Sequence, residues 1–270
     1  MSTTPYYQLS IVAHDVGCEV RLNDVPVLRL PGGHVETRFD VNPYVLGGAN
    51  RLSLHVREAE DKDSFSPASA VRVSIGVRDS VEAPADSTRE VATLAFSAPS
   101  EGPIGFEASG EVAVSLRGLV ASTTFDLDVP FGPWFWLSSP ELEPTEALRT
   151  DLLGMYRRMH AMLNARDSAA LMQGCALQAG DWQMAYGLPD IDAAQQMLGI
   201  AATLADPDVG VEPFPEGVLT LELLGGGRLV QLVDDEGHSP LRLTMKSDAD
   251  MVGRFNVVLC RSGGGWVIAR

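Results

Sequence analysis

The chain has 270 residues, which is long for a single hydrophobic core and comfortable for two domains. With 45% hydrophobic residues and a mean hydropathy of +0.05, its composition is typical of a soluble globular protein. Its 36 acidic residues outnumber its 20 basic residues, so the formal net charge is −16. A field of this sign repels phosphate backbones and anionic lipid headgroups, which argues against binding to nucleic acid or to a membrane surface.

The acidity is spread along the whole chain. Residues 1–140 carry 18 acidic and 10 basic residues, and residues 141–270 carry the same numbers. The charge therefore belongs to both halves of the chain and is not an acidic tail. It favours a basic protein partner, and the alternative is that it only keeps the protein in solution.

Targeting features and cysteines indicate the compartment. The first residues lack the basic region and the apolar run of a signal peptide, and no segment reaches the roughly 18 uninterrupted apolar residues of a membrane span. Cys18, Cys175 and Cys260 form no CxxC pair, so we expect buried free thiols, as in a reducing compartment. These features predict a cytoplasmic protein.

Short segments of alternating apolar and polar residues fill the first 133 residues. Loops rich in Gly, Pro, Ser and Asp separate them, a pattern typical of an all-β sandwich. The strands are expected at residues 8–13, 18–22, 25–30, 35–39, 52–56, 71–77, 91–96, 112–116 and 125–129. We therefore predict a β-sandwich domain over residues 1–133.

Two motifs in this region resemble a known family. Residues 38–54 hold a short turn followed by a Gly-x-Asn-x-Leu entry into a strand, and the hairpin turn Leu22-Asn23-Asp24 precedes it. Both resemble the corner of galactose-binding-like jelly rolls, over about residues 5–60. The resemblance implies a jelly-roll-like fold and no binding site, since these motifs are structural.

An aromatic block follows the last expected strand. Pro130, Gly132 and Pro133 end that strand, because proline cannot donate to a strand ladder and glycine favours a turn. Residues 134–136 are Trp-Phe-Trp, and residues 134–144 are expected to form a linker. We expect the aromatic side chains to pack between the two domains, and the alternative is a stacking platform for a sugar or a base.

The second half changes from helical to strand periodicity. Thr145 and Glu146 are typical of a helix start. Apolar residues at spacings of three and four predict helices at residues 146–163, 167–180 and 190–205. Strands are expected at residues 219–223, 229–233, 241–246, 255–259 and 266–268, so residues 145–270 are predicted to form an α+β domain.

This second region also resembles a known family. The ending Arg-x-Gly-Gly-Gly-Trp-x-Ile at residues 261–268 and the helix segment 155–167 are similar to the nuclear-transport-factor-like (cystatin-like) fold. The resemblance implies an α+β cone with three helices on a curved antiparallel sheet. That family commonly has a strand between its second and third helices, and here only a short strand near Trp182–Ala185 is expected.

The cone of that family encloses a pocket, which several members use for small ligands or for isomerase and hydratase chemistry. The polar residues expected to reach such a pocket are Tyr156, His160, Asp181, Trp182 and Tyr186. A carboxylate beside an aromatic hydroxyl can transfer protons when burial moves its pKa. The alternative is that these are satisfied core residues, and no residue is assigned a catalytic role.

Other sites are argued against by the absence of their motifs. The sequence contains no GxSxG, HExxH, GxGxxG or phosphate-loop motif. No loop has the ladder of oxygen ligands that calcium needs, and the histidines are scattered, so neither a metal nor a cofactor is predicted. The dense acidic stretch Asp234, Asp235, Glu236 and His238 is predicted to be an exposed hairpin turn that presents negative charge to an arginine-rich partner.

The leading hypothesis is a non-enzymatic, acidic, two-domain module that binds and inhibits a basic protein. Its character is similar to that of bacterial immunity proteins, which neutralise toxins. One alternative is a small-molecule pocket protein or an isomerase- or hydratase-like enzyme that uses the C-terminal cone. Another is carbohydrate binding by the N-terminal sandwich, which needs exposed aromatic residues such as Tyr6, Tyr7 and Tyr44.

Overall fold

The computed structural model describes residues 4–60, 62–80, 82–98, 105–107, 111–115, 118–215 and 217–270. The chain divides into two compact units, Met1–Pro133 and Trp134–Arg270. Over the described residues the fold is mixed, with four sheets of antiparallel strands and five α-helices. None of the helices in these ranges has the length and apolar composition needed to cross a membrane.

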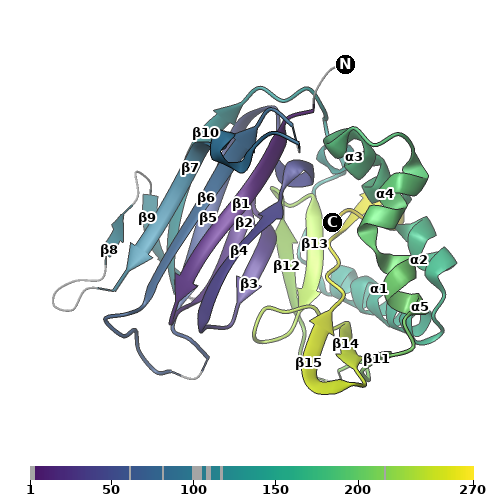
Figure 1. Ribbon diagram of the computed structural model, residues 1–270. Coiled ribbons are helices and arrows are strands. Elements are labelled where there is room, and N and C mark those ends of the chain that lie inside the picture. The colour runs from purple at the N-terminus through teal and green to yellow at the C-terminus, as the bar shows by residue number, and fades with distance from the viewer. Residues whose placement is uncertain are drawn as a thin grey trace. The chain divides into compact units, whose positions relative to one another are not determined.

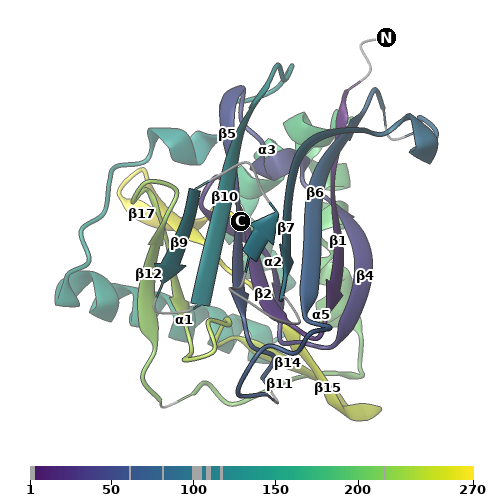
Figure 2. The ribbon, with the colours of Figure 1, turned by 90° about the vertical axis from the view of Figure 1, so that its left-hand side faces the viewer.

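The first unit contains two five-stranded antiparallel sheets. Their strand orders are β4-β1-β6-β7-β8 and β3-β2-β5-β10-β9. Figure 1 shows the long strands, and Figure 2 shows β4 beside β1 and β9 beside β10. The strands are β1 (Tyr6–His14), β2 (Gly17–Leu22), β3 (Val25–Leu30), β4 (His34–Asp40), β5 (Gly48–Arg57), β6 (Ala70–Arg78), β7 (Arg89–Ser97), β8 (Gly105–Glu107), β9 (Glu111–Ser115) and β10 (Gly118–Leu127), with short 3-10 helices η1 (Asn42–Tyr44) and η2 (Ala85–Ser87).

Alternating side chains from both sheets form one buried core. Leu9 on β1 and Ile75 on β6 come from the first sheet, and Val20 on β2 and Leu54 on β5 come from the second. All four are fully buried, while the residues between them on each strand face the other side of their sheet. Apolar burial on this scale is the main force that stabilises the unit.

Most of the strands expected in this unit are confirmed. One expected strand differs in extent, and one observed strand was not expected. The strand expected at residues 125–129 is only the end of β10, which begins at Gly118. The first half of β10 mixes small and hydroxyl side chains without a clear period of two, so the sequence pattern missed it. β8 was not expected at all, and Leu116, at the end of another expected strand, lies outside the described residues.

The two motifs of the jelly-roll resemblance meet at a buried amide pair. Asn50, only 2% exposed, accepts a hydrogen bond from the Leu46 N–H at 2.7 Å and one from Asn23 Nδ2 at 2.8 Å. Asn50 Nδ2 donates to the carbonyls of Leu46 and Gly48. Asn23 has a φ of 55° and Asp24 of 66°, the left-handed pair of a tight hairpin turn that Asn and Asp tolerate. The hairpin turn and the loop before β5 are thereby joined.

A carboxylate between two arginines lies on the second sheet. Glu19 on β2 accepts hydrogen bonds from Nε of Arg21 and from Nε of Arg29, and all three side chains are at most 15% exposed. Burial raises the pKa of Glu19, but the attraction of Arg29 and Arg21 outweighs it, so the net pKa is lowered.

The second unit contains one short 3-10 helix, five α-helices and seven strands over the described residues. They are η3 (Phe135–Ser138), α1 (Glu146–Asn164), α2 (Ser168–Gly174), α3 (Ala176–Tyr186), α4 (Ile191–Leu198), α5 (Ile200–Ala205), β11 (Val209–Val211), β12 (Thr220–Leu224), β13 (Leu229–Val233), β14 (Arg242–Met245), β15 (Asp248–Arg254), β16 (Leu259–Ser262) and β17 (Gly265–Ile268). The strands form two sheets, β11-β14-β15 and β12-β13-β16-β17, where one curved sheet was expected.

The predicted helix starts are confirmed by side-chain caps. The hydroxyl of Thr145 accepts the Leu148 N–H, and the carboxylates of Asp167 and Asp190 each accept an amide three residues on. The apolar face of α1 is buried as its spacing predicted, and it packs in one core with residues of β13 and β16.

Two expected helices are each divided in two. Cys175 separates α2 from α3, and Gly199, with a φ of 72°, separates α4 from α5. A residue in the left-handed conformation, such as Gly199, ends a helix, because the backbone beyond it no longer follows the helical hydrogen-bond pattern. The short strand expected near Trp182–Ala185 is wrong, since these residues belong to α3. The strand expected at 255–259 is also wrong, because only Leu259 is in a strand.

The aromatic block belongs to the second unit, and so does the rest of the expected linker. Trp134 and Trp136 are 2% and 3% exposed. The Arg270 guanidinium lies 5.5 Å from the Trp134 ring centre, and Trp136 lies against Gly225, where a Cβ would come within 2.9 Å of its ring. All three cysteines are free and buried, as the sequence predicted.

We expect Asn50→Ala to destabilise the first unit by about 3 kcal/mol, because it removes the hydrogen bonds of a buried amide to Asn23 and to the backbone of Leu46 and Gly48. Urea unfolding followed by far-UV circular dichroism would measure this. The control is Asn256→Ala, at an exposed asparagine, which should change the free energy of unfolding little. Equal stability of both variants would contradict the structural role of Asn50.

We expect Glu19→Gln to lower stability by about 2 kcal/mol at pH 7. Since the folded-state pKa of Glu19 is lowered, its ionised form stabilises the fold above the pKa of an unfolded glutamate. That contribution is lost as the pH falls through the folded-state value, so the two proteins should converge in stability in the acid range. Chemical unfolding at a series of pH values tests this, with Glu58→Gln at an exposed position as control. A difference that stays constant with pH would refute it.

Candidate functional site

The predicted acidic turn lies between β13 and β14, and its first carboxylate is buried. Asp234 is 7% exposed. Arg242 Nη2 donates to its Oδ2 at 3.0 Å, and the His238 N–H donates to its Oδ1 at 2.7 Å. Arg254 Nη1 lies 3.6 Å from the same carboxylate. The turn is confirmed, but the prediction that Asp234 is exposed is wrong.

The remaining residues of this turn are more accessible. Asp235 and Glu236 are exposed, and His238 is half-buried. A carboxylate oxygen of Glu236 lies 3.3 Å from His238 Nδ1 and 3.9 Å from Arg254 Nη2. Two arginines thus offset much of the charge of the three acids, so this turn presents less negative charge to a partner than the sequence suggested.

The same turn brings three possible metal-ligating side chains together. Ligand atoms of Asp234, Glu236 and His238 all lie within 4.8 Å of one another. A cation bound there would compete with the Arg242 and Arg254 guanidinium groups for the same carboxylates, and would be repelled by both. The arrangement therefore favours an internal ion-pair network over metal binding.

Tyr156 was predicted to reach a pocket and is instead fully buried on α1. Its hydroxyl donates to the Val257 carbonyl at 2.8 Å and accepts the Leu232 N–H at 3.1 Å. The phenol hydroxyl therefore joins α1 to β13 at Leu232 and to the segment before β16 at Val257. This use matches the core role that was the alternative for this residue.

Asp181 forms a buried ion pair with Arg270. Arg270 Nη1 donates to Asp181 Oδ2 at 2.8 Å, and both residues are at most 6% exposed. The Phe135 N–H donates to the other carboxylate oxygen at 3.4 Å. Burial raises the pKa of Asp181, and the attraction of Arg270 and the Phe135 hydrogen bond oppose that rise without cancelling it.

The other three predicted pocket residues have separate contacts. His160 Nε2 is 2.7 Å from the Glu212 carbonyl, and the imidazole packs edge-on against Phe214. Trp182 and Tyr186 form a T-shaped pair on α3, with ring centres 5.7 Å apart. The five residues are therefore held by different contacts, and none of them lines the cavity described next.

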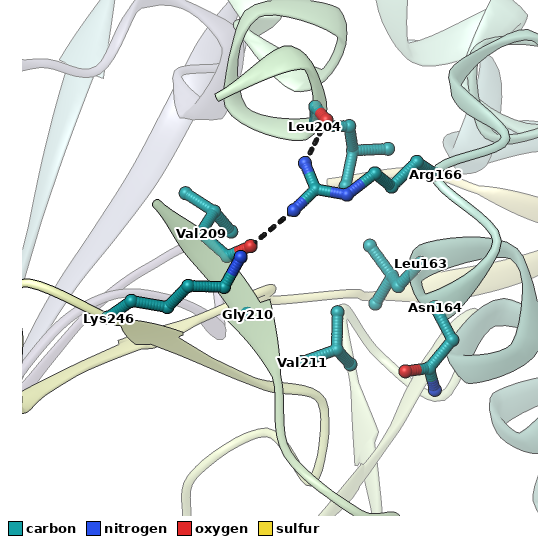
Figure 3. Close-up of a pocket in the computed structure, with 8 residues that line it drawn as sticks. All are labelled: Leu163, Asn164, Arg166, Leu204, Val209, Gly210, Val211 and Lys246. Atoms are coloured by element: carbon teal, nitrogen blue, oxygen red, sulfur yellow. Dashed lines mark hydrogen bonds between the residues drawn. The ribbon is translucent and has the colours of Figure 1, made fainter. Parts of the chain in front are cut away.

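A small cavity lies where the C-terminal ends of α1 and α5 approach β11 (Figure 3). Its volume is about 130 Å³. It is lined by Leu163, Asn164, Arg166, Leu204, Val209, Gly210, Val211 and Lys246. Ligand pockets usually have roughly 300–1,000 Å³, so this cavity is small for a metabolite.

The two cations of this cavity are bonded to backbone carbonyls. Arg166 donates to Leu204 and Asp206 with Nη1 and to Val209 with Nη2, at 2.6–2.8 Å. Lys246 Nζ donates to the Pro207 carbonyl at 2.5 Å. Figure 3 shows the Arg166 guanidinium directed at the carbonyls of Leu204 and Val209. Arg166 therefore satisfies carbonyls at the end of α5 that have no helical partner, which is a structural role.

Helices α3 and α4 carry four exposed apolar side chains that sequence reasoning missed. Leu177, Met184, Ile191 and Met197 are 37–46% exposed. The helical spacing signalled an apolar face but could not show that part of it stays uncovered. We call these four residues, with the exposed Asp190 and Asp192, the α3–α4 surface.

Sugar binding was predicted to need exposed aromatic residues on the first unit. Tyr6 and Tyr7 are 9% and 2% exposed, and Tyr44 is half-buried at the end of η1. Tyr6 and Tyr7 therefore do not form the exposed platform that this hypothesis requires.

Comparisons with protein-family models, with curated proteins and with solved structures find no match for this chain.

We expect Asp181→Asn to destabilise the second unit by about 3–5 kcal/mol, because it leaves the buried Arg270 charge without its partner. The double variant Asp181→Leu with Arg270→Met should recover most of the loss, since it removes both charges. All four tryptophans lie in the second unit, so their fluorescence during urea unfolding reports on that unit alone. Asp192→Asn, at an exposed position, is the control, and no loss in Asp181→Asn would contradict the ion-pair assignment.

Proposed function

We propose that the protein is a non-enzymatic module that binds a basic protein partner. The observation that carries this proposal is the α3–α4 surface, where exposed apolar side chains lie on the same two helices as exposed carboxylates, in a chain with a net charge of −16. Protein-binding surfaces often combine an apolar centre with a polar or charged rim.

The apolar part of the surface follows from helix geometry. Leu177 and Met184 are seven residues apart on α3, which places them on one face, two turns apart. Helix α4 packs beside α3 in the same unit (Figure 1), and adds Ile191 and Met197. Methionine adapts its shape to different partners, and two of the four exposed residues are methionines.

The charged part supports a partner of opposite sign. Asp190 and Asp192 are exposed at the N-terminal end of α4. The second unit carries 18 acidic and 10 basic residues, so its field attracts cationic proteins and raises their association rate at low salt. A fitting partner presents an apolar anchor surrounded by arginine or lysine.

An inhibitor of a basic bacterial toxin domain is the kind of protein that this combination suits best. Tyr156, Asp181 and His160, which the sequence predicted to reach a pocket, form internal hydrogen bonds. This supports a binding role over an enzymatic one. The three buried free thiols are compatible with a protein that acts in a reducing cytoplasm.

We also propose the finer fold. Two five-stranded antiparallel sheets around one core support a jelly-roll-like β-sandwich in the first unit. The helix α1 packed in one core with sheet residues supports a cystatin-like arrangement in the second. An experimental structure of the chain tests both parts.

The function is tested by capture and reconstitution. The tagged chain is used to capture proteins from its native host at low salt, and the retained basic protein is identified, purified and titrated into the purified chain. We expect a stoichiometric complex that Met184→Asp weakens at least about tenfold. Asp190→Asn with Asp192→Asn should slow association several-fold at low salt, while asparagine preserves the cap of α4.

The matched control is Asp126→Asn with Asp128→Asn, which removes two exposed carboxylates at the same spacing from the first unit. This variant should bind nearly as well as the unchanged chain. The proposal fails if no basic protein forms a reconstituted complex, or if the control weakens the complex and the α3–α4 variants do not.

A further inference from the structure

Two histidines are held opposite each other at the edge of the first sheet. His14 is the last residue of β1 and His34 is the first of β4, and the antiparallel register pairs them directly. Their Nδ1 atoms are 2.9 Å apart, within hydrogen-bonding distance, and their ring centres are 4.2 Å apart. Both side chains are exposed, and β4 is the outer strand of its sheet.

Within the described residues, the charged side chains near this pair are bonded to other side chains, with the exception of Glu36. The Asp15 carboxylate is bonded to Lys62 and Ser66, and Arg72 on β6 pairs with Glu90. Glu36 lies two residues along β4 from His34, on the same exposed face. Within the described part of the chain, neither imidazole has an ion pair with a carboxylate.

The spacing of the two nitrogens suits a transition-metal ion. Imidazole nitrogens coordinate such ions at about 2.0–2.1 Å, so two of them 2.9 Å apart subtend about 90° at the metal. This is the angle between adjacent ligands in octahedral or square-planar geometry, and a small ring rotation opens it to the tetrahedral angle. Imidazole suits Zn²⁺, Cu²⁺ and Ni²⁺, whereas Ca²⁺ and Mg²⁺ require oxygen ligands.

We propose that His14 and His34 form a binding site for a late first-row divalent transition-metal ion. The protein ligands of this ion are the two Nδ1 atoms, and water can complete the coordination. The strand register already holds the two rings together, so little side-chain entropy is lost on binding. A bound ion joins the outer strand β4 to β1 and stabilises the first unit, by an amount that rises with the logarithm of its concentration above the dissociation constant.

Proton competition follows from the chemistry of the ligands. An imidazole nitrogen must be unprotonated to bind a metal, so the affinity falls as the solution is made more acidic.

The experiment is a calorimetric titration of Ni²⁺ and of Zn²⁺ into the full chain without an added histidine tag, at pH 7.5 and pH 5.5. We expect one site of micromolar affinity at pH 7.5 that weakens at least about tenfold at pH 5.5. His14→Gln and His34→Gln should each weaken it at least about tenfold, as expected for loss of one of two protein ligands. His238→Gln, in the Asp234 turn, is the matched control and should leave it unchanged.

A second measurement does not depend on variants. On addition of Zn²⁺, the ¹⁵N resonances of Nδ1 of His14 and His34 should shift, while those of His238 should not. The proposal is overturned if the unchanged chain binds neither ion, if binding survives loss of both His14 and His34, or if His238→Gln abolishes it.

Discussion

The structure depends on the pairing of buried carboxylates with arginine. Glu19 lies between Arg21 and Arg29, Asp181 pairs with Arg270, and Asp234 pairs with Arg242. A buried charge without a partner is very costly, so each of these acids needs a nearby base. Only 20 bases are available for 36 acids, and several of them are committed to these inner sites. The excess of carboxylates on the surface follows from this distribution.

The same constraint limits the chemistry that the interior can perform. Asp181 has a raised pKa, which is often a sign of a catalytic acid. Here its two oxygens are occupied by Arg270 and by the Phe135 N–H, and the Tyr156 hydroxyl is occupied by two backbone groups. Groups satisfied in this way stabilise one arrangement of the core.

The sequence predicted features that depend on neighbouring residues and missed those that depend on distant ones. Caps such as Thr145 and Asp190 and the alternation in β1 are local, and they were confirmed. The burial of Asp234 depends on arginines supplied by β14 and β15, so its local pattern suggested an exposed turn. The pairing of His14 with His34 requires the register of two strands, which residue spacing alone does not give.

The acidic surface affects the two proposed sites to different extents. For a basic protein, the field of the carboxylates adds attraction at every distance within the screening length, about 8 Å at physiological salt. For a metal ion at His14 and His34, the field also attracts the cation, but most of the affinity comes from the bonds between the metal and the two ring nitrogens. Salt should therefore weaken protein binding clearly and metal binding less. Because the sites lie in different units, the sensitivity of each to salt can be measured without disturbing the other.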